Sequence, residues 1–172
     1  MKRAIVFIDG NNWYHNSKEL MREIGEIDFR KLSKFVCDRF GFELIGINYY
    51  NSIPNILSSS YSKHKNFIEE LKKDNIVVKL KELTGYGKHQ KEKGVDILIA
   101  LDIIRKVIIE KVCDACVLVS GDADFLSVEE ILRECGYDFC SASVLNGYAN
   151  KLRSGKYKFI VLKKGDILNC LK

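Results

Sequence analysis

The sequence predicts an α/β fold, in which one three-layer domain spanning residues 1–172 has a central, mainly parallel sheet between two layers of helices. Short apolar, β-branched runs alternate along the chain with longer segments of helical periodicity. Strands that alternate with helices pair in parallel through right-handed crossovers, so this order of elements favours a doubly wound, Rossmann-like sheet. The 172 residues are 47% hydrophobic and 30% charged, which is typical of a single domain with its own core.

Six segments have strand character. Each is a short apolar or β-branched run bounded by turn residues, as expected of strands buried in a parallel sheet. They cover residues 3–8, 42–50, 76–83, 115–120, 137–142 and 158–162.

Five segments have helical spacing. They cover residues 28–40, 60–74, 95–111, 125–135 and 148–154. Asp28 is the expected N-cap of its helix, and Gly41 follows the end of the same helix, as N-cap and C-cap preferences require. The segment 95–111 is apolar on nearly every face, which predicts a helix buried against the sheet.

Composition excludes several classes of protein. No apolar run exceeds five residues, whereas a membrane-spanning helix needs about 20. Asp9 also ends the first apolar run before it reaches the length of a signal-peptide core. We therefore expect a cytoplasmic protein without a membrane partner. The six cysteines fit a reducing compartment as buried thiols, since Cys113 and Cys116 lack the second pair of ligands of a zinc site.

The charge is unevenly distributed, although the net charge is only +5. Residues 63–93 and 147–172 carry net charges of +4 and +6, and residues 94–146 carry −6. Solvated helix faces would account for this asymmetry. The alternative is a polyanionic substrate held by lysines beside a carboxylate cluster that binds a metal ion.

Four aspartates are expected at one edge of the sheet. Asp9 follows the first strand, Asp122 and Asp124 follow the fourth, and Asp96 begins the helix 95–111. Open parallel sheets bind ligands beyond the carboxyl ends of their strands, so these three segments should converge there. Carboxylates a few ångström apart repel one another, and a divalent cation relieves that repulsion. Oxygen ligands without His or Cys favour Mg²⁺ or Mn²⁺ over zinc.

Each aspartate also has a local role open to it. Asp9 can cap the turn after its strand. Asp122 and Asp124 can each be the N-cap of the helix that begins at Phe125, and Asp124 stands at the expected position. Asp96 can stabilise the first turn of its helix through the helix dipole. Asp102 lies six residues after Asp96, about 240° away around the helix. Asp102 is therefore expected to support the site or the core from behind.

Three motifs resemble those of the NYN domain family of PIN-like nucleases. They are Ile8-Asp9-Gly10-Asn11-Asn12, Lys93-Gly94-Val95-Asp96 with Asp102 six residues further on, and Ser120-Gly121-Asp122-Ala123-Asp124-Phe125. The resemblance extends from about residue 3 to residue 163. It implies a PIN-like fold with an acidic, metal-binding pocket. It also implies a metal-dependent ribonuclease that hydrolyses RNA phosphodiesters with Mg²⁺ or Mn²⁺.

The resemblance also assigns residues. It makes Asp9, Asp96, Asp122 and Asp124 the expected catalytic metal ligands. Asn12 matches the Asn of the first family motif, whose amide orients the first aspartate or a phosphate. Ser120 matches the small hydroxyl residue that precedes Gly-Asp in the third motif, and both Asn12 and Ser120 are expected substrate-binding residues.

Basic residues near these motifs are the expected RNA contacts. Lys88, Lys91 and Lys93 precede Asp96 in a glycine-containing loop, and Arg153 lies in the last basic segment. Loop lysines are also commonly just solvated, so that interpretation stays open for each of them. A homodimer, the common default among oligomers, is a further expectation.

The chain departs from the family pattern at one position. Many relatives have an acidic residue just before the last strand, where this sequence has Tyr157. This difference leaves a second interpretation open. In that interpretation the protein is a catalytically inactive RNA-binding or scaffold module that retains the acidic pocket.

Overall fold

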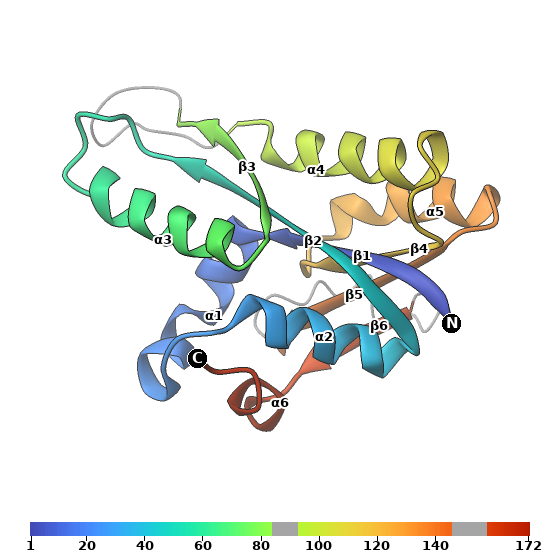
Figure 1. Ribbon diagram of the computed structural model, residues 1–172, viewed down its shortest axis with the longest axis horizontal. Coiled ribbons are helices and arrows are strands. Elements are labelled where there is room, and N and C mark those ends of the chain that lie inside the picture. Colours follow the sequence, from blue (N-terminus) through green and yellow to red (C-terminus); the bar gives the residue numbers. More distant parts are fainter. Residues whose placement is uncertain (84–92, 146–157) are drawn as a thin grey trace.

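The six expected strands form one parallel sheet in the computed structural model, which describes residues 1–83, 93–145 and 158–172 (Figure 1). They are β1 (Lys2–Asp9), β2 (Phe42–Ile53), β3 (Val77–Glu82), β4 (Ala115–Val119), β5 (Asp138–Val144) and β6 (Lys158–Leu162). Their order is β3-β2-β1-β4-β5-β6, and all neighbouring pairs are parallel. This is the doubly wound order with its switch point between β1 and β4, so the predicted fold class is confirmed.

Helices cover both faces of the sheet. One face carries α1 (Gly10–Ile24), α2 (Phe29–Phe40), α3 (Tyr61–Lys73) and α6 (Lys164–Leu168). The other face carries α4 (Val95–Ile104), its π-helical continuation η2 (Arg105–Ile109) and α5 (Leu126–Glu134). The short 3-10 helix η3 (Ala123–Phe125) directly precedes α5. Side chains of β1 alternate between the two layers, with Val6 and Ile8 in one core and Ile5 and Phe7 in the other. This alternation follows from the pleat of a strand.

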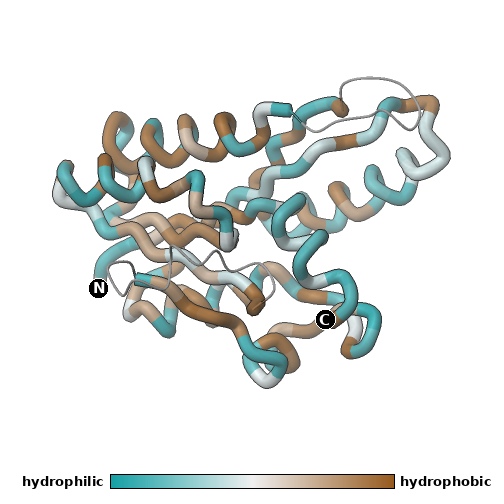
Figure 2. Tube along the Cα trace, turned by 180° about the vertical axis from the view of Figure 1, so that it is seen from behind, coloured by the Kyte–Doolittle hydropathy of each residue, from teal (hydrophilic) through white to brown (hydrophobic). Residues whose placement is uncertain are grey.

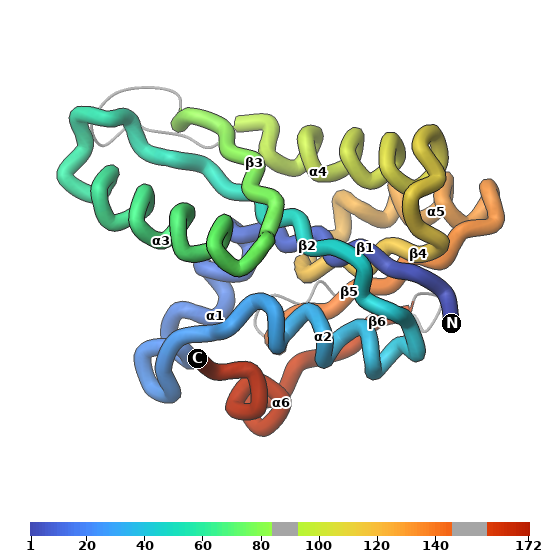
Figure 3. The backbone as a smooth tube through the Cα atoms, viewed as in Figure 1, coloured from blue at the N-terminus to red at the C-terminus, as the bar shows by residue number. Residues whose placement is uncertain are grey.

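Both caps predicted for α2 are formed. The Asp28 side chain accepts hydrogen bonds from the backbone N–H groups of Arg30 (2.8 Å) and Lys31 (3.1 Å). Gly41 ends the helix with a φ of 75°, a left-handed conformation that glycine adopts without strain. The chain after β6 returns to this helix, where the backbone N–H of Asp28 donates to the carbonyl of Cys170 (2.8 Å) (Figure 3).

Two helices, α1 and α6, were not among the predicted elements. The buried face of α1 carries Trp13, and Trp13 packs edge-on against Phe29 of α2, with ring centroids 5.9 Å apart. The helix ends at Gly25, whose φ is 112°. The predicted helix at 148–154 lies outside the described residues.

Helix α4 packs against the sheet as expected, but only one of its sides is buried, although its sequence is apolar on nearly every face. Ile99 and Ile103 are fully buried, whereas Ile97 and Leu101 are 65% and 59% exposed. The sheet and α5 pack against one side of α4, and its outer side is at the surface. Figure 2 shows the α4 trace as predominantly hydrophobic along an outer margin of the molecule. Among the described residues, no helix is long and apolar enough to cross a membrane.

The cysteines are free thiols, and five of the six are buried, as predicted. Burial raises the pKa of Cys37 and that of Cys140 to about 12. These thiols are therefore protonated at neutral pH and act as small apolar core residues.

Candidate functional site

The three acidic motifs meet at the carboxyl edge of the sheet, where β1 and β4 lie side by side. Asp9 is the last residue of β1, Asp96 is in the first turn of α4, and Asp122 and Asp124 follow β4. Their charges act on one another. Asp96 and Asp122 contribute to raising the pKa of Asp9, while Asp122 and Asp124 contribute to raising the pKa of Asp96. The structure thus brings the four predicted aspartates into one electrostatic group.

Asp9 is the buried member of this acidic group. Its residue is 3% exposed, and burial is the main cause that raises its pKa from 3.8 to about 6. The charges of Asp96 and Asp122 add to the rise, while hydrogen bonds from the Asn12 backbone and the Ser120 side chain oppose it. A carboxylate in this position is costly to ionise without a cation.

Hydrogen bonds hold the Asp9 carboxylate between the first turn of α1 and the loop after β4. The backbone N–H of Asn12 donates to one carboxylate oxygen at 3.0 Å, and the Ser120 hydroxyl donates to the other at 3.1 Å. The Asn12 side-chain oxygen accepts from the N–H of Gly121 at 3.2 Å, and Ser120 Oγ accepts from the N–H of Asp122 at 3.3 Å. Asn12 and Ser120 therefore orient Asp9 and connect the start of α1 to the loop after β4.

The capping role considered for Asp9 is real, and it coexists with the acidic group. Asp9 is the N-cap of α1, which begins at Gly10 immediately after β1. A Cβ atom at Gly10 would collide with the Tyr49 hydroxyl and stand 2.7 Å from the carbonyl oxygen of Tyr50. Glycine is thus required where β1 turns into α1, because the first turn of the helix packs directly on β2.

Of the two N-cap candidates in the loop after β4, Asp122 has this role. The Asp122 carboxylate accepts a hydrogen bond from the N–H of Asp124 at 2.9 Å, so Asp122 is the N-cap of η3. The predicted N-cap role of Asp124 is wrong because the helical turn begins two residues earlier than expected, at Ala123. Asp124 is exposed instead, and its charge acts on Asp96.

Asp102 lies in a different environment from Asp96, although both are on α4. It is 5% exposed and accepts a hydrogen bond from Lys79 Nζ at 2.6 Å and another from the Tyr50 hydroxyl. Asn48 Nδ2 lies 3.5 Å from the same carboxylate. Sequence reasoning missed Asn48, Tyr50 and Lys79, because only the pairing of β2 with β3 places them beside α4.

The predicted RNA-contacting residues are described only in part. Lys93 is exposed and directly precedes Gly94. Gly94 is the N-cap of α4 and has a left-handed φ of 78°. The other basic candidates and the departure from the family pattern lie outside the described residues. These are Lys88, Lys91, Arg153 and Tyr157.

The side chains of the acidic group offer carboxylate oxygens as ligands. Among residues 1–83, 93–145 and 158–172, no group of three or more His, Cys, Asp or Glu side chains is arranged so that it could hold a metal ion by itself. Mg²⁺ keeps several waters and is usually held by one or two carboxylates together with substrate phosphate. The donor chemistry of the group, carboxylate oxygens around the buried Asp9, fits Mg²⁺ or Mn²⁺.

Comparisons with known proteins agree with the motifs. Residues 3–163 match the family model of the NYN domain, whereas no curated protein matches the chain. The solved structures to which the chain is similar include two hydrolytic enzymes. One is an isochorismatase-like hydrolase from Alkaliphilus metalliredigens, with 16% identity over 94% of this chain and 95% of that chain and a TM-score of 0.42. The other is N-carbamoylsarcosine amidase from Thermoplasma acidophilum, with 11% identity over 94% and 96% and a TM-score of 0.31.

Similarities at this distance carry no argument about function. The family match does, since it covers nearly the whole chain. The chain therefore belongs to the NYN domain family, whose fold is that of the PIN-like nucleases.

Proposed function

We propose that the protein is a metal-dependent nuclease that hydrolyses RNA phosphodiesters. One observation carries this proposal: four aspartates from three distant segments share the carboxyl edge of the sheet, and the buried member, Asp9, has a pKa raised to about 6. Within the part of the chain that the structure describes, no Lys, Arg or His forms an ion pair with Asp9. Strongly perturbed carboxylates of this kind are typical of functional sites. Membership of the NYN domain family supports the same conclusion.

Asp9, Asp96, Asp122 and Asp124 are the residues that would hold Mg²⁺ or Mn²⁺. When bound, such an ion polarises a phosphoryl oxygen and lowers the pKa of a water molecule. The chain itself supplies orientation, because Asn12 and Ser120 hold the Asp9 carboxylate through hydrogen bonds of 3.0 and 3.1 Å.

Helix α1 contributes to phosphate binding in this proposal. It has 15 residues and begins directly after Asp9, so the positive end of its dipole lies at the site. Lys93, at the start of α4, is proposed to contact the RNA backbone, as are Lys88, Lys91 and Arg153. In-line attack by water would leave 5′-phosphate and 3′-hydroxyl ends.

The proposal is tested by incubating purified protein with end-labelled single-stranded RNA in Mn²⁺, Mg²⁺ or EDTA. Asp122→Asn is run in parallel, with Asp138→Asn as a matched control from the opposite edge of the sheet. Loss of a ligand should cost at least the roughly 10- to 100-fold known for residues that merely support metal ligands. We therefore expect metal-dependent cleavage that falls by about 100-fold or more in Asp122→Asn and persists in Asp138→Asn.

Two results would contradict the proposal. Equal cleavage by the wild type and Asp122→Asn would place the activity elsewhere. RNA that is bound but uncut under every condition would instead support the binding-module interpretation raised by Tyr157.

A further inference from the structure

Asp9 is one end of a row of side chains that crosses three strands. In the sheet register Asp9 lies opposite Tyr50 of β2, and Tyr50 lies opposite Lys79 of β3. Residues in register on parallel strands point to the same face of the sheet, and this face is the one that α4 covers. The Tyr50 ring stacks on Phe7 of β1, with centroids 6.3 Å apart.

Asp102 of α4 joins the far end of this row. Its Oδ1 accepts from Lys79 Nζ at 2.6 Å, and its Oδ2 accepts from the Tyr50 hydroxyl. Asn48 Nδ2 supports the arrangement by donating to the Tyr50 hydroxyl at 3.2 Å. Asp102 is 5% exposed and Tyr50 is fully buried, while Lys79 reaches the surface with a third of its side chain exposed. The buried Asp102 carboxylate thus has a cationic partner in Lys79 and a hydroxyl donor in Tyr50.

The network anchors α4 in a way that its apolar contacts do not. Helix α4 packs on the sheet through residues such as Val95, Ile99 and Ile103, and hydrophobic contacts are non-directional. Hydrogen bonds to Asp102 are directional, so they define the rotation and axial position of the helix. Asp96 is six residues earlier on the same helix, a distance of about 9 Å at 1.5 Å per residue. A shift of α4 would therefore move Asp96 relative to Asp9.

We propose that Lys79, Tyr50 and Asp102 form a positioning network that fixes α4 on the sheet and thereby sets the affinity of the acidic site for a divalent cation. Lys79 and Tyr50 act through Asp102 and do not contact the ion or the RNA. The part of the inference that concerns metal affinity rests on the proposed function, whereas the anchoring of α4 does not.

The test compares four variants of the full chain. Lys79→Met leaves the buried Asp102 without its cation, Lys79→Arg keeps the charge, and Tyr50→Phe removes only the hydroxyl donor. Lys34→Met is the matched control, since Lys34 pairs with Asp38 at 2.5 Å on the surface of α2. Each variant is measured by amide hydrogen exchange along α4 and by titration with Mn²⁺.

We expect faster exchange in α4 and about 10-fold or more weaker Mn²⁺ binding in Lys79→Met and Tyr50→Phe, as for other residues that support metal ligands. Lys79→Arg should recover most of the affinity, and Lys34→Met should match the wild type. Unchanged exchange in Tyr50→Phe and Lys79→Met would overturn the anchoring role. Faster exchange with unchanged Mn²⁺ affinity would overturn the link to the site. Failure of the proposed function can be distinguished from failure of this inference. If the proposed function is wrong, Asp122→Asn binds Mn²⁺ as the wild type does. The hydrogen-exchange data still show in that case whether the network anchors α4.

Discussion

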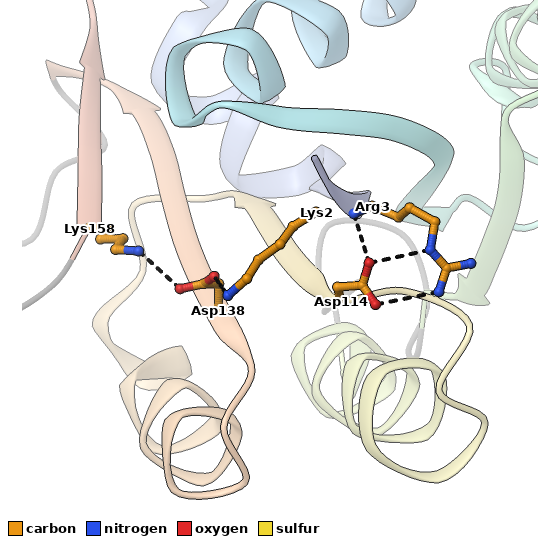
Figure 4. Close-up of polar contacts among 5 residues, drawn as sticks. All are labelled: Lys2, Arg3, Asp114, Asp138 and Lys158. Atoms are coloured by element: carbon orange, nitrogen blue, oxygen red, sulfur yellow. Dashed lines mark hydrogen bonds and ion pairs between the residues drawn. The ribbon is translucent and has the colours of Figure 1, made fainter.

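Aspartates at the two edges of the sheet are in opposite electrostatic states. At the amino edge, Asp138 accepts from Lys2 Nζ at 2.5 Å and from Lys158 Nζ at 2.9 Å, and Asp114 accepts from the backbone N–H and side chain of Arg3 (Figure 4). Hydrogen bonds from these partners lower the pKa of Asp138 and that of Asp114. These carboxylates connect the first residues of β1, β5 and β6 and the approach to β4.

The carboxyl edge has the reverse arrangement. Asp9 and Asp96 both have raised pKa values, for which burial is the first cause and neighbouring aspartates add to the effect. At the amino edge, aspartates that are paired with basic side chains stabilise the folded state. At the carboxyl edge, the burial of Asp9 and the repulsion among neighbouring aspartates destabilise it. The carboxyl edge therefore lowers the stability of the fold, as binding and catalytic sites commonly do.

The sharpest test of this contrast is Asp9→Asn. In the metal-free protein at pH 7, the variant should be more stable than the wild type by up to about 3 kcal/mol, since a pKa of about 6 instead of 3.8 penalises the ionised carboxylate. Asn retains the N-cap of α1. Between about pH 4 and 6 the folded wild type binds the proton more tightly than the unfolded chain does. Its stability should therefore fall as the pH rises through this window, and urea unfolding in EDTA measures the difference.

Asp138→Asn is the matched control, with the opposite sign. Its lowered pKa means that Asp138 stabilises the fold above the ordinary pKa of an aspartate and loses this effect as the pH falls through the lowered value. The variant should therefore be less stable than the wild type at pH 7 and similar to it in strong acid. If Asp9→Asn were destabilised at pH 7 in the same way, the contrast between the edges would be wrong.

Gly10→Ala tests the packing that positions Asp9. The added methyl group would stand 2.7 Å from the backbone oxygen of Tyr50, and overpacking of this kind costs about 1–3 kcal/mol. Gly165→Ala in α6 is the control, since its Cβ would meet nothing within 4 Å and should stabilise the protein by about 0.4–1 kcal/mol. Thermal unfolding of both variants checks the prediction, which fails if the two move in the same direction.

Lys158→Met should have the smallest effect. The Lys158 side chain is 62% exposed, and exposed ion pairs contribute about 0.2–1 kcal/mol. Asp138 also keeps its second partner, Lys2. We expect a small loss of stability that disappears at high salt, measured by urea unfolding in low and high NaCl. A loss that persists at high salt would mean that the amino edge is held by more than ion pairing.

Much of the fold could be predicted because its signals are local. The strands are continuous apolar runs, and α2 has both of its caps written in the sequence as Asp28 and Gly41. Helix α1 was missed because its first turn, Gly10-Asn11-Asn12, has the composition of a loop. Its helical conformation depends on capping by Asp9 and on the packing of Trp13 against Phe29.

Part of the candidate site could likewise be predicted from the sequence, and part of it could not. The meeting of Asp9, Asp96 and Asp122 follows from a topological rule about strand ends, so sequence order was enough to predict it. The contact of Asp102 with Tyr50 and Lys79 depends on the register of β2 against β3 and on the rotation of α4. Neither quantity is encoded in the spacing of residues along the chain.

The most direct test of the central claim is a calorimetric titration of the metal-free protein with Mn²⁺ at pH 7. The wild type, Asp122→Asn and Asp138→Asn are compared in the same buffer. If the carboxyl edge is a divalent-cation site, the wild type and Asp138→Asn will bind saturably, and the affinity of Asp122→Asn will fall by about 10-fold or more. Absence of saturable binding, or equal binding by all three proteins, would contradict the account.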